Sequence, residues 1–90
     1  MEEPRAGALR LRFRGRLDAA TTGTVWRHAD ETVRNAKARE VVVDAAGIDY
    51  CDGAGIALLV HLRNLQNSAG GALQIEGLRP EFASLLDDAV

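Results

Sequence analysis

The stretch "VVVDAAGIDYCDGAG", from Val41 to Gly55, decides the fold of this 90-residue chain. Its three consecutive valines predict a strand that is buried on both faces, which is typical of a parallel sheet. Residues 46–55 are predicted to form a turn, and a helix is expected from Gly53 to Gln66. A buried strand that leads through a glycine-rich turn into a helix is the repeating unit of an α/β domain.

The segments on the N-terminal side continue this alternation. "ALRLRFRGRL" (residues 8–17) alternates apolar residues with arginines, which predicts a half-buried strand that ends at Gly15. Asp18 or Thr21 is then expected to cap a helix. The apolar stripe of this helix, at helical spacing, consists of Val25, Ala29, Val33 and Ala36, with Trp26 beside it.

The segments on the C-terminal side complete the pattern. Gly70 or Gly71 is expected to end the central helix in a left-handed conformation. "ALQIEG" (72–77) predicts a third strand, and "RPEFASLLDDA" (79–89) predicts a last helix with Pro80 near its first turn. The apolar side of this last helix consists of Phe82, Leu85 and Leu86.

The resulting order of elements is β-α-β-α-β-α. It predicts an α/β fold with a small, mostly parallel β-sheet flanked by helices, in one domain over residues 1–90. A sheet of only three strands has exposed edges, and each edge needs to be covered by a tail, a partner or another copy of the chain. A homodimer through a sheet edge is therefore one expected assembly.

The composition excludes several classes of protein. A hydrophobic content of 47% and a charged content of 27% are typical of a soluble globular domain. A net charge of -2 and dispersed arginines argue against a nucleic-acid partner. The single cysteine cannot form a disulfide within the chain, which fits a reducing compartment. "MEEPRAG" is not a signal peptide, and no apolar run reaches the roughly 18 residues of a membrane span, so a cytoplasmic location without membrane insertion is expected.

The "DGAG" cluster (52–55) has two interpretations. Main-chain amides at the start of a helix attract anions, so a phosphate-binding loop is one of them. The spacing is not G-x-G-x-x-G, however, and the lysine and threonine of a phosphate loop are missing. The other interpretation is a turn from strand to helix in which Asp52 caps the helix and the glycines allow close packing. The missing lysine and threonine favour this second interpretation.

No set of residues for catalysis or metal binding can be assembled from the sequence. His28 and His61 lie on separate predicted helices, and Cys51 has no neighbouring base. One cysteine and two separated histidines do not have the spacing of a metal site. The chain is therefore expected to be no enzyme and to use neither a cofactor nor a metal.

The central helix is predicted to be apolar on two sides. The side that suits the sheet consists of Ala54, Leu58, Leu62 and Leu65, with Leu59 at its margin. The opposite side consists of Ile56, Ala57 and Val60, bordered by His61, Arg63 and Asn64. A surface helix needs only one apolar stripe, so either a neighbouring helix or a partner protein covers the second side. Trp26 is expected either in the core or as an interface anchor.

These residues resemble the STAS domain family, named for sulfate transporters and anti-sigma factor antagonists. The resemblance covers nearly the whole chain and includes "GRLDAAT" (15–21), "VVVDAAGIDYCDGAG" (41–55) and "GGALQIEGL" (70–78). It implies a STAS-like fold and a non-enzymatic protein-interaction module. The family usually has one more strand, which precedes "ALRLRFRG", and "MEEPRAG" cannot supply it.

The turn departs from the family pattern in one respect. Anti-sigma factor antagonists resemble this chain but carry Asp-Ser-Ser-Gly or a threonine variant here, and their partner kinase phosphorylates a serine of that turn. This chain has Ala54 at the acceptor position, and alanine has no oxygen that could accept a phosphate. The resemblance therefore implies a docking surface without a phosphorylation switch.

A closer resemblance is to the STAS branch attached to lipid-transport ABC systems of the Mla type. It rests on "GIALLVHLRN" (55–64) and on "TVWRHADETV" (24–33). In that branch the STAS domain is a separate subunit, or is fused ahead of the membrane permease, and it docks on the ATPase subunit. The resemblance implies that the contact residues are Asp52, Gly53, Ala54, Gly55, Ile56, Val60 and His61, with Gly53 where the branch often has threonine.

Three functions are consistent with these patterns. The first is a cytoplasmic accessory domain of an Mla-like lipid ABC transporter, held at the inner face of the membrane by the ATPase and permease or by a fused permease. The second is a partner-switching regulator of transcription that resembles an anti-sigma factor antagonist. The third is a sensor that binds a nucleotide or a lipid at the start of the central helix.

Overall fold

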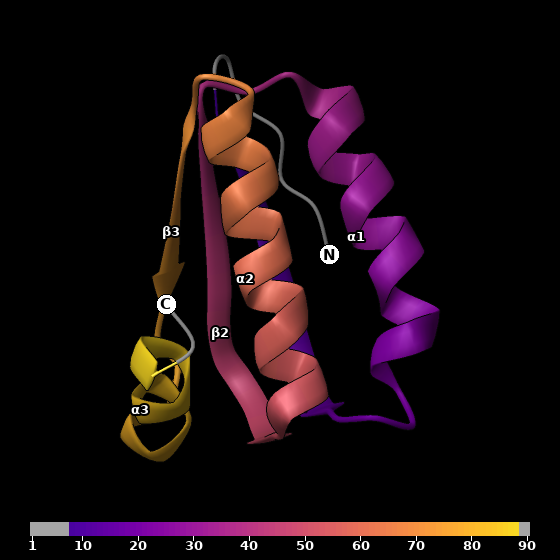
Figure 1. Ribbon diagram of the computed structural model, residues 1–90, viewed down its shortest axis with the longest axis vertical. Helices are drawn as coiled ribbons and strands as arrows, with labels where there is room; N and C mark the ends of the chain where they lie inside the picture. Colours follow the sequence, from indigo (N-terminus) through magenta and orange to yellow (C-terminus); the bar gives the residue numbers. More distant parts are fainter. Residues whose placement is uncertain (1–7, 89–90) are drawn as a thin grey trace.

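Three parallel strands and three helices alternate along the chain in the order that the sequence predicts. The computed structural model describes residues 8–88. The elements are β1 (Ala8–Leu17), α1 (Thr22–Ala36), β2 (Glu40–Cys51), α2 (Gly53–Ser68), β3 (Ala72–Glu76) and α3 (Pro80–Asp88). β2 is the central strand of the sheet, between β1 and β3, and Figure 1 shows β3 to the left of β2. The expectation that "MEEPRAG" supplies no strand concerns residues 1–7, which lie outside the described residues.

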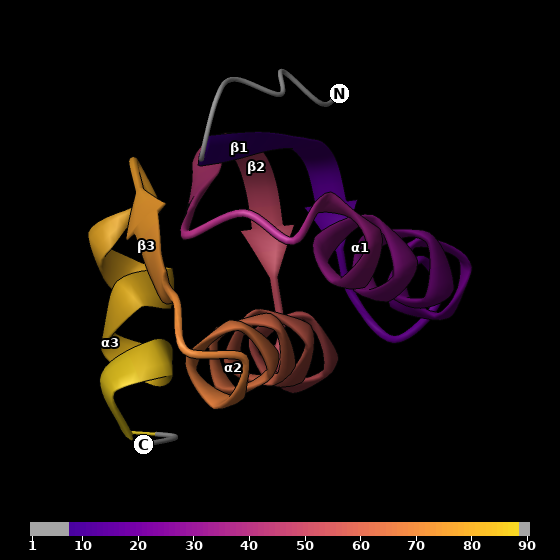
Figure 2. The ribbon, with the colours of Figure 1, turned by 90° about the horizontal axis from the view of Figure 1, so that it is seen from above.

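The helices cover one face of the sheet. α1 and α2 lie side by side on that face, and α3 contacts α2 and lies beyond the carboxyl end of β3 (Figures 1 and 2). Along β2, Val41 and Val43 are buried beneath the helices, whereas Val42 is half-buried on the other face. The prediction that this strand is buried on both faces is therefore wrong. Within residues 8–88 the helices form a single layer, so alternate residues of β2 reach the surface.

Charged side chains occupy the second face of the sheet. Arg10 Nη2 donates to Asp44 Oδ2 at 3.1 Å, and Arg10 Nη1 lies 3.6 Å from Glu76 Oε1. Arg12 Nε lies 3.4 Å from the same oxygen of Asp44. The main-chain amide of Ala46 and then the Arg10 guanidinium lower the pKa of Asp44 from its ordinary value, against the opposing effect of burial. Arg10 thus faces carboxylates from both other strands, and Arg12 faces that of β2.

Both long strands extend further than the sequence predicts. β1 continues past Gly15 to Leu17, because Gly15 adopts a φ of 77° at a shift in register and the pairing then resumes. β2 includes residues 46–51, which the sequence assigns to a turn. Pairing between Leu17 and Cys51 keeps this segment extended. Asp52 is the one residue between β2 and α2.

The core lies between the sheet and α2. Leu58, Leu59 and Leu62 of this helix are 0% exposed, while Leu65 is only half-buried. The buried residues of the predicted stripes on α1 and α3 are Ala29, Val33, Phe82 and Leu86. The other predicted stripe residues differ: Val25 is half-buried against the core, Ala36, at the end of α1, is exposed, and Leu85 is 44% exposed.

Candidate docking site at the start of α2

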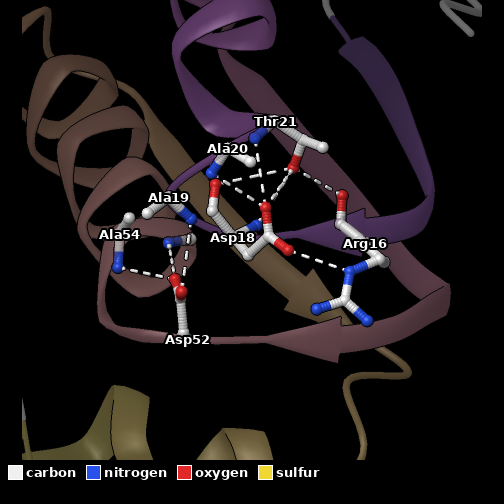
Figure 3. A network of polar contacts seen from close by, with 8 residues as sticks. Arg16, Asp18, Ala19, Ala20, Thr21, Asp52 and Ala54 are labelled. Carbon is white, nitrogen blue, oxygen red and sulfur yellow. Dashed lines mark hydrogen bonds and ion pairs between the residues drawn. The ribbon is translucent and has the colours of Figure 1, made fainter.

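The carboxylate of Asp52 closes the start of α2. Its Oδ1 accepts hydrogen bonds from the main-chain amides of Ala54 at 2.9 Å and Gly55 at 3.3 Å, which confirms the predicted N-cap (Figure 3). Its Oδ2 accepts from the amide of Ala19 at 3.2 Å. The side chain therefore ties the loop between β1 and α1 to α2. It also occupies the place where a phosphate would meet the amides of the helix.

Asp18 organises the neighbouring loop. Its Oδ1 accepts from the amides of Ala20 at 3.0 Å and Thr21 at 3.1 Å, and its Oδ2 accepts from Arg16 Nε at 2.9 Å (Figure 3). The hydrogen bond from Arg16 is the largest cause of the lowered pKa of Asp18. Thr21 stands at the N-cap position of α1, but its side chain bonds within the loop and not into the helix. Neither residue therefore caps α1 in the predicted manner.

The two glycines of the turn have different surroundings. Gly55 is buried, and a Cβ there would collide with the main-chain oxygen of Leu17 and lie 2.7 Å from Cys51 Sγ. Gly53 is exposed, and a Cβ there would have no neighbour within 4 Å. The structure therefore places Gly53 on the surface, whereas Gly55, which is also predicted to contact a partner, lies against β1.

A groove of about 680 Å³ runs along the outer side of α2. One wall is Trp26 of α1 and the other is Leu85 of α3. The residues of α2 that line it are Gly53, Ile56, Ala57, Val60, His61 and Asn64. The predicted second apolar side of α2 is thus flanked by two helices but not covered by them, since Ala57 is exposed and Leu85 is 44% exposed.

Four of the seven predicted contact residues meet in this groove; they are Gly53, Ile56, Val60 and His61. Ile56 is only 4% exposed, because α1 and α3 stand on either side of it. Asp52 and Ala54 are half-buried at the helix start and do not line the groove. The contribution of Leu85 is not apparent from the sequence, where its position on an apolar stripe predicts burial.

His61 connects α2 to α1. Its Nε2 donates to Asp30 Oδ1 at 2.7 Å, and its ring stacks on Trp26 with 4.9 Å between centroids and 28° between planes. Asp30 also accepts from Arg34 Nε at 2.9 Å. The hydrogen bond from His61, followed by that from Arg34, lowers the pKa of Asp30. Trp26 is half-buried, so it packs on the domain and also presents a surface to the groove.

The chemistry of Cys51 is that of a packed side chain. Its side chain is 2% exposed, and burial, followed by the charge of Asp52, raises the pKa of its thiol to about 11. A thiol with such a pKa is almost fully protonated at neutral pH and is a poor nucleophile. Within residues 8–88, no three His, Cys, Asp or Glu side chains gather closely enough to hold a metal ion. None of the helices described there has the length and apolar character to span a membrane.

The fold and the groove define a class: a two-layer α/β domain with parallel strands, whose candidate site is an apolar surface beside a capped helix start. The chain belongs to the STAS domain family. The family model described as "Mlab, STAS domain" matches residues 2–89. This match confirms the resemblance that the turn and its flanking segments indicate.

The proteins that are similar to this chain include anti-sigma factor antagonists. An anti-sigma F factor antagonist of Paenibacillus polymyxa is 26% identical over 85 residues, which are 94% of this chain and 73% of that protein. The unphosphorylated form of the anti-sigma factor antagonist SpoIIAA has a TM-score of 0.78 at 11% identity, over 97% of this chain and 80% of the other. The phosphorylated form of SpoIIAA, from Bacillus, has a TM-score of 0.76 at 12% identity, over 99% of this chain and 81% of the other. The predicted STAS-like fold is therefore confirmed.

Proposed function

We propose that this chain is a protein-interaction module and serves as a cytoplasmic accessory domain of an Mla-like phospholipid ABC transporter. The match to the family model described as "Mlab, STAS domain" supports this reading. The observation that carries it is the open apolar groove beside a helix start that has Ala54 in place of a phosphate acceptor. In this role the groove docks on the ATPase subunit, and the domain is either a separate subunit or fused to the permease.

The groove has the composition of a protein interface. Trp26, Ala57, Val60 and Leu85 supply apolar surface, and Trp26 is the type of residue that anchors interfaces. His61 and Asn64 supply a polar border. No bond has to be made or broken for such a module to act, because docking that differs between two states of a transporter stabilises the state it prefers.

The test uses two substitutions in the groove and a matched control for each. Gly53→Arg and Val60→Asp place a charge in the groove, and we expect each to weaken binding to the ATPase at least tenfold, or about 1.4 kcal/mol. Gly23→Arg is the control for the first, since Gly23 is also exposed with no neighbour within 4 Å of a Cβ. Val42→Asp, at a half-buried valine on the opposite face of the sheet, is the control for the second.

Pull-down of the ATPase with all four variants gives the readout, after circular dichroism has established that each is folded. Wild-type binding by both controls and reduced binding by both groove variants is the expected result. Folded groove variants that bind as tightly as the wild type would show that the docking site lies elsewhere.

A second candidate function is that of a partner-switching regulator. The 26% identity to an anti-sigma F factor antagonist supports it. Incubation with a candidate kinase and ATP, followed by intact-mass measurement and peptide mapping, separates the two functions. The transporter hypothesis predicts no gain of mass at residues 46–55, where Ala54 occupies the acceptor position. A phosphate located in this segment would favour the regulator.

A further inference from the structure

A second cavity lies at the opposite end of α1 and α2 from the docking groove. Both helices end there, at the upper edge of Figure 1, and the cavity measures about 510 Å³. Its lining residues are Val33, Arg34, Lys37, Ala38, Arg39, Leu65, Gln66, Ala69, Gly70 and Gly71. The volume is within the range of about 300–1,000 Å³ that small-molecule sites occupy.

The charged residues that line this cavity are all basic. Arg34, Lys37 and Arg39 contribute three positive charges in a chain whose net charge is -2, and no acidic residue belongs to the lining. Arg34 forms an ion pair with Asp30, with 2.9 Å between Arg34 Nε and Asp30 Oδ2. Lys37 and Arg39 form no ion pair with any residue in the part of the chain that the structure describes. Among residues 8–88, the cavity therefore has two lining cations that no carboxylate neutralises.

Lys37 occupies a backbone position that favours glycine. It follows the last residue of α1 with φ 48° and ψ 37°, and it is the one non-glycine residue with positive φ among residues 8–88. A left-handed conformation is less favourable for a residue with a Cβ than for glycine. A glycine would end this helix at lower cost, so the lysine contributes something other than the shape of the turn.

Hydrogen bonds between two loops hold the cavity in shape. Gln66, which is 2% exposed, donates from Nε2 to the main-chain oxygen of Ala38 at 2.7 Å. The amide of Gly71 donates to Gln66 O at 3.1 Å, and the amide of Ala72 donates to Arg39 O at 3.0 Å. The bond from Gln66 joins α2 to the α1–β2 connection, and the bond from Ala72 joins the start of β3 to the same connection, so the cavity exists without a ligand.

A simpler role for the basic residues is to neutralise the negative ends of the two helix dipoles. At the end of α2, however, the amides of Ala69, Gly70 and Gly71 already satisfy terminal carbonyl groups of the helix. Gly70, with a φ of 85°, forms the left-handed stop that the sequence predicts. Dipole compensation also gives no reason for a cavity with an apolar interior from Val33, Ala38 and Leu65.

We propose that this cavity binds a small organic anion, with a carboxylate or phosphate group at Lys37 and Arg39 and a short apolar body against Val33 and Leu65. Charge and shape together define this ligand class, because a free inorganic anion would leave the apolar part of the cavity empty. The site lies apart from the docking groove and shares no lining residue with it. The proposal therefore stands or falls independently of the transporter role.

Titration of the whole ¹⁵N-labelled chain with octyl phosphate, below its aggregation concentration, tests the site. We expect saturable NMR shifts in the amides of residues 37–39 and 69–71, and at least tenfold weaker binding of inorganic phosphate. Lys37→Gly is expected to raise the octyl phosphate Kd at least tenfold while its Tm stays equal or rises, because the left-handed position is relieved. Arg27→Ala, at an exposed arginine of α1 outside the cavity, is the charge-matched control and leaves the Kd unchanged.

Three results would overturn the proposed site, and a fourth would overturn the ligand class proposed for it. One is the absence of saturable shifts, and another is a set of shifts centred on the docking groove at Gly53 and Ala57. The third is a Lys37→Gly variant that binds octyl phosphate as tightly as Arg27→Ala does. Inorganic phosphate that binds as tightly as octyl phosphate would also contradict the apolar part of the ligand.

Discussion

Gly55 sets how closely α2 approaches β1. A Cβ at this position would meet Leu17 O and Cys51 Sγ, so Gly55→Ala forces the helix away from the strand. We expect a loss of about 1–3 kcal/mol in the free energy of unfolding. Gly53→Ala is the matched control: with no neighbour within 4 Å, it is expected to stabilise by up to about 1 kcal/mol, because alanine restricts the unfolded chain. Urea unfolding measures both, and equal losses would contradict this assignment.

Cys51 is shielded from solvent where it packs against the start of α2. Its thiol is buried, and its pKa is raised to about 11. We expect the native protein at pH 8 to react with a thiol reagent such as DTNB far more slowly than the protein in guanidinium chloride, where the thiol is exposed and its pKa returns toward about 8.5. Similar rates in the two conditions would mean that the start of α2 opens readily.

Residue roles could be predicted from the sequence where they depend on near neighbours. Asp52 lies directly before the helix, so its cap follows from position alone. The pair of Asp30 and His61 is separated by 31 positions and depends on how α1 and α2 pack, which no local pattern specifies. The burial of Gly55 likewise depends on the contact with β1.

At the scale of elements, the periodicity of α2 predicts which side faces the sheet but not how far the core reaches around the helix. Leu58 and Leu62 are fully buried as expected. Ile56 is predicted on the opposite side, yet it is 4% exposed because α1 and α3 flank that side. A hydrophobic pattern predicts the side of the helix on which a residue lies, whereas the burial of that residue also depends on neighbouring helices.

The contact between α1 and α2 gives the docking groove one of its walls. His61→Ala removes both the ring stacked on Trp26 and the donor to Asp30, so we expect a loss of about 1 kcal/mol in stability. Trp26 is the only tryptophan, so the fluorescence emission maximum of the protein reports on its surroundings. We expect this maximum to shift in His61→Ala, because the indole loses the ring that stacks on it. His28→Ala, at an exposed histidine of α1, is the control and should leave the emission unchanged. An unchanged spectrum in His61→Ala would show that the stack does not position Trp26.

The molecule as a whole is a sheet with helices on one face and charges on the other. The order of elements could be predicted from the alternation of patterns, because parallel strands require crossover helices. The exposure of the second face of the sheet could not be predicted, since a run of three valines looks the same whether helices cover one face of the strand or both. The arginines of β1 do alternate in the sequence, but their partners Asp44 and Glu76 come from other strands.

Three carboxylates with lowered pKa values hold different parts of this architecture together. Asp18 shapes the loop before α1, Asp30 joins α1 to α2, and Asp44 joins β1 to β2. The largest causes that lower these pKa values are Arg16, His61 and the amide of Ala46, respectively. Each carboxylate therefore favours the folded state only while it is ionised.

This linkage predicts the direction of acid unfolding. A carboxyl whose pKa is lower in the folded state contributes stability above its unfolded value of about 3.9, and it loses that contribution as the pH falls through the folded value. We expect the free energy of unfolding from urea titrations to be insensitive to these groups above about pH 5 and to fall as the pH drops below about 4. Asp30→Asn should lower stability at neutral pH and flatten the acid slope, because one fewer proton is taken up on unfolding in acid. Salt at about 0.5 M should reduce the difference between wild type and variant by screening these half-exposed pairs. If Asp30→Asn has the same acid slope as the wild type, the bond between Asp30 and His61 does not contribute to the acid sensitivity of the fold.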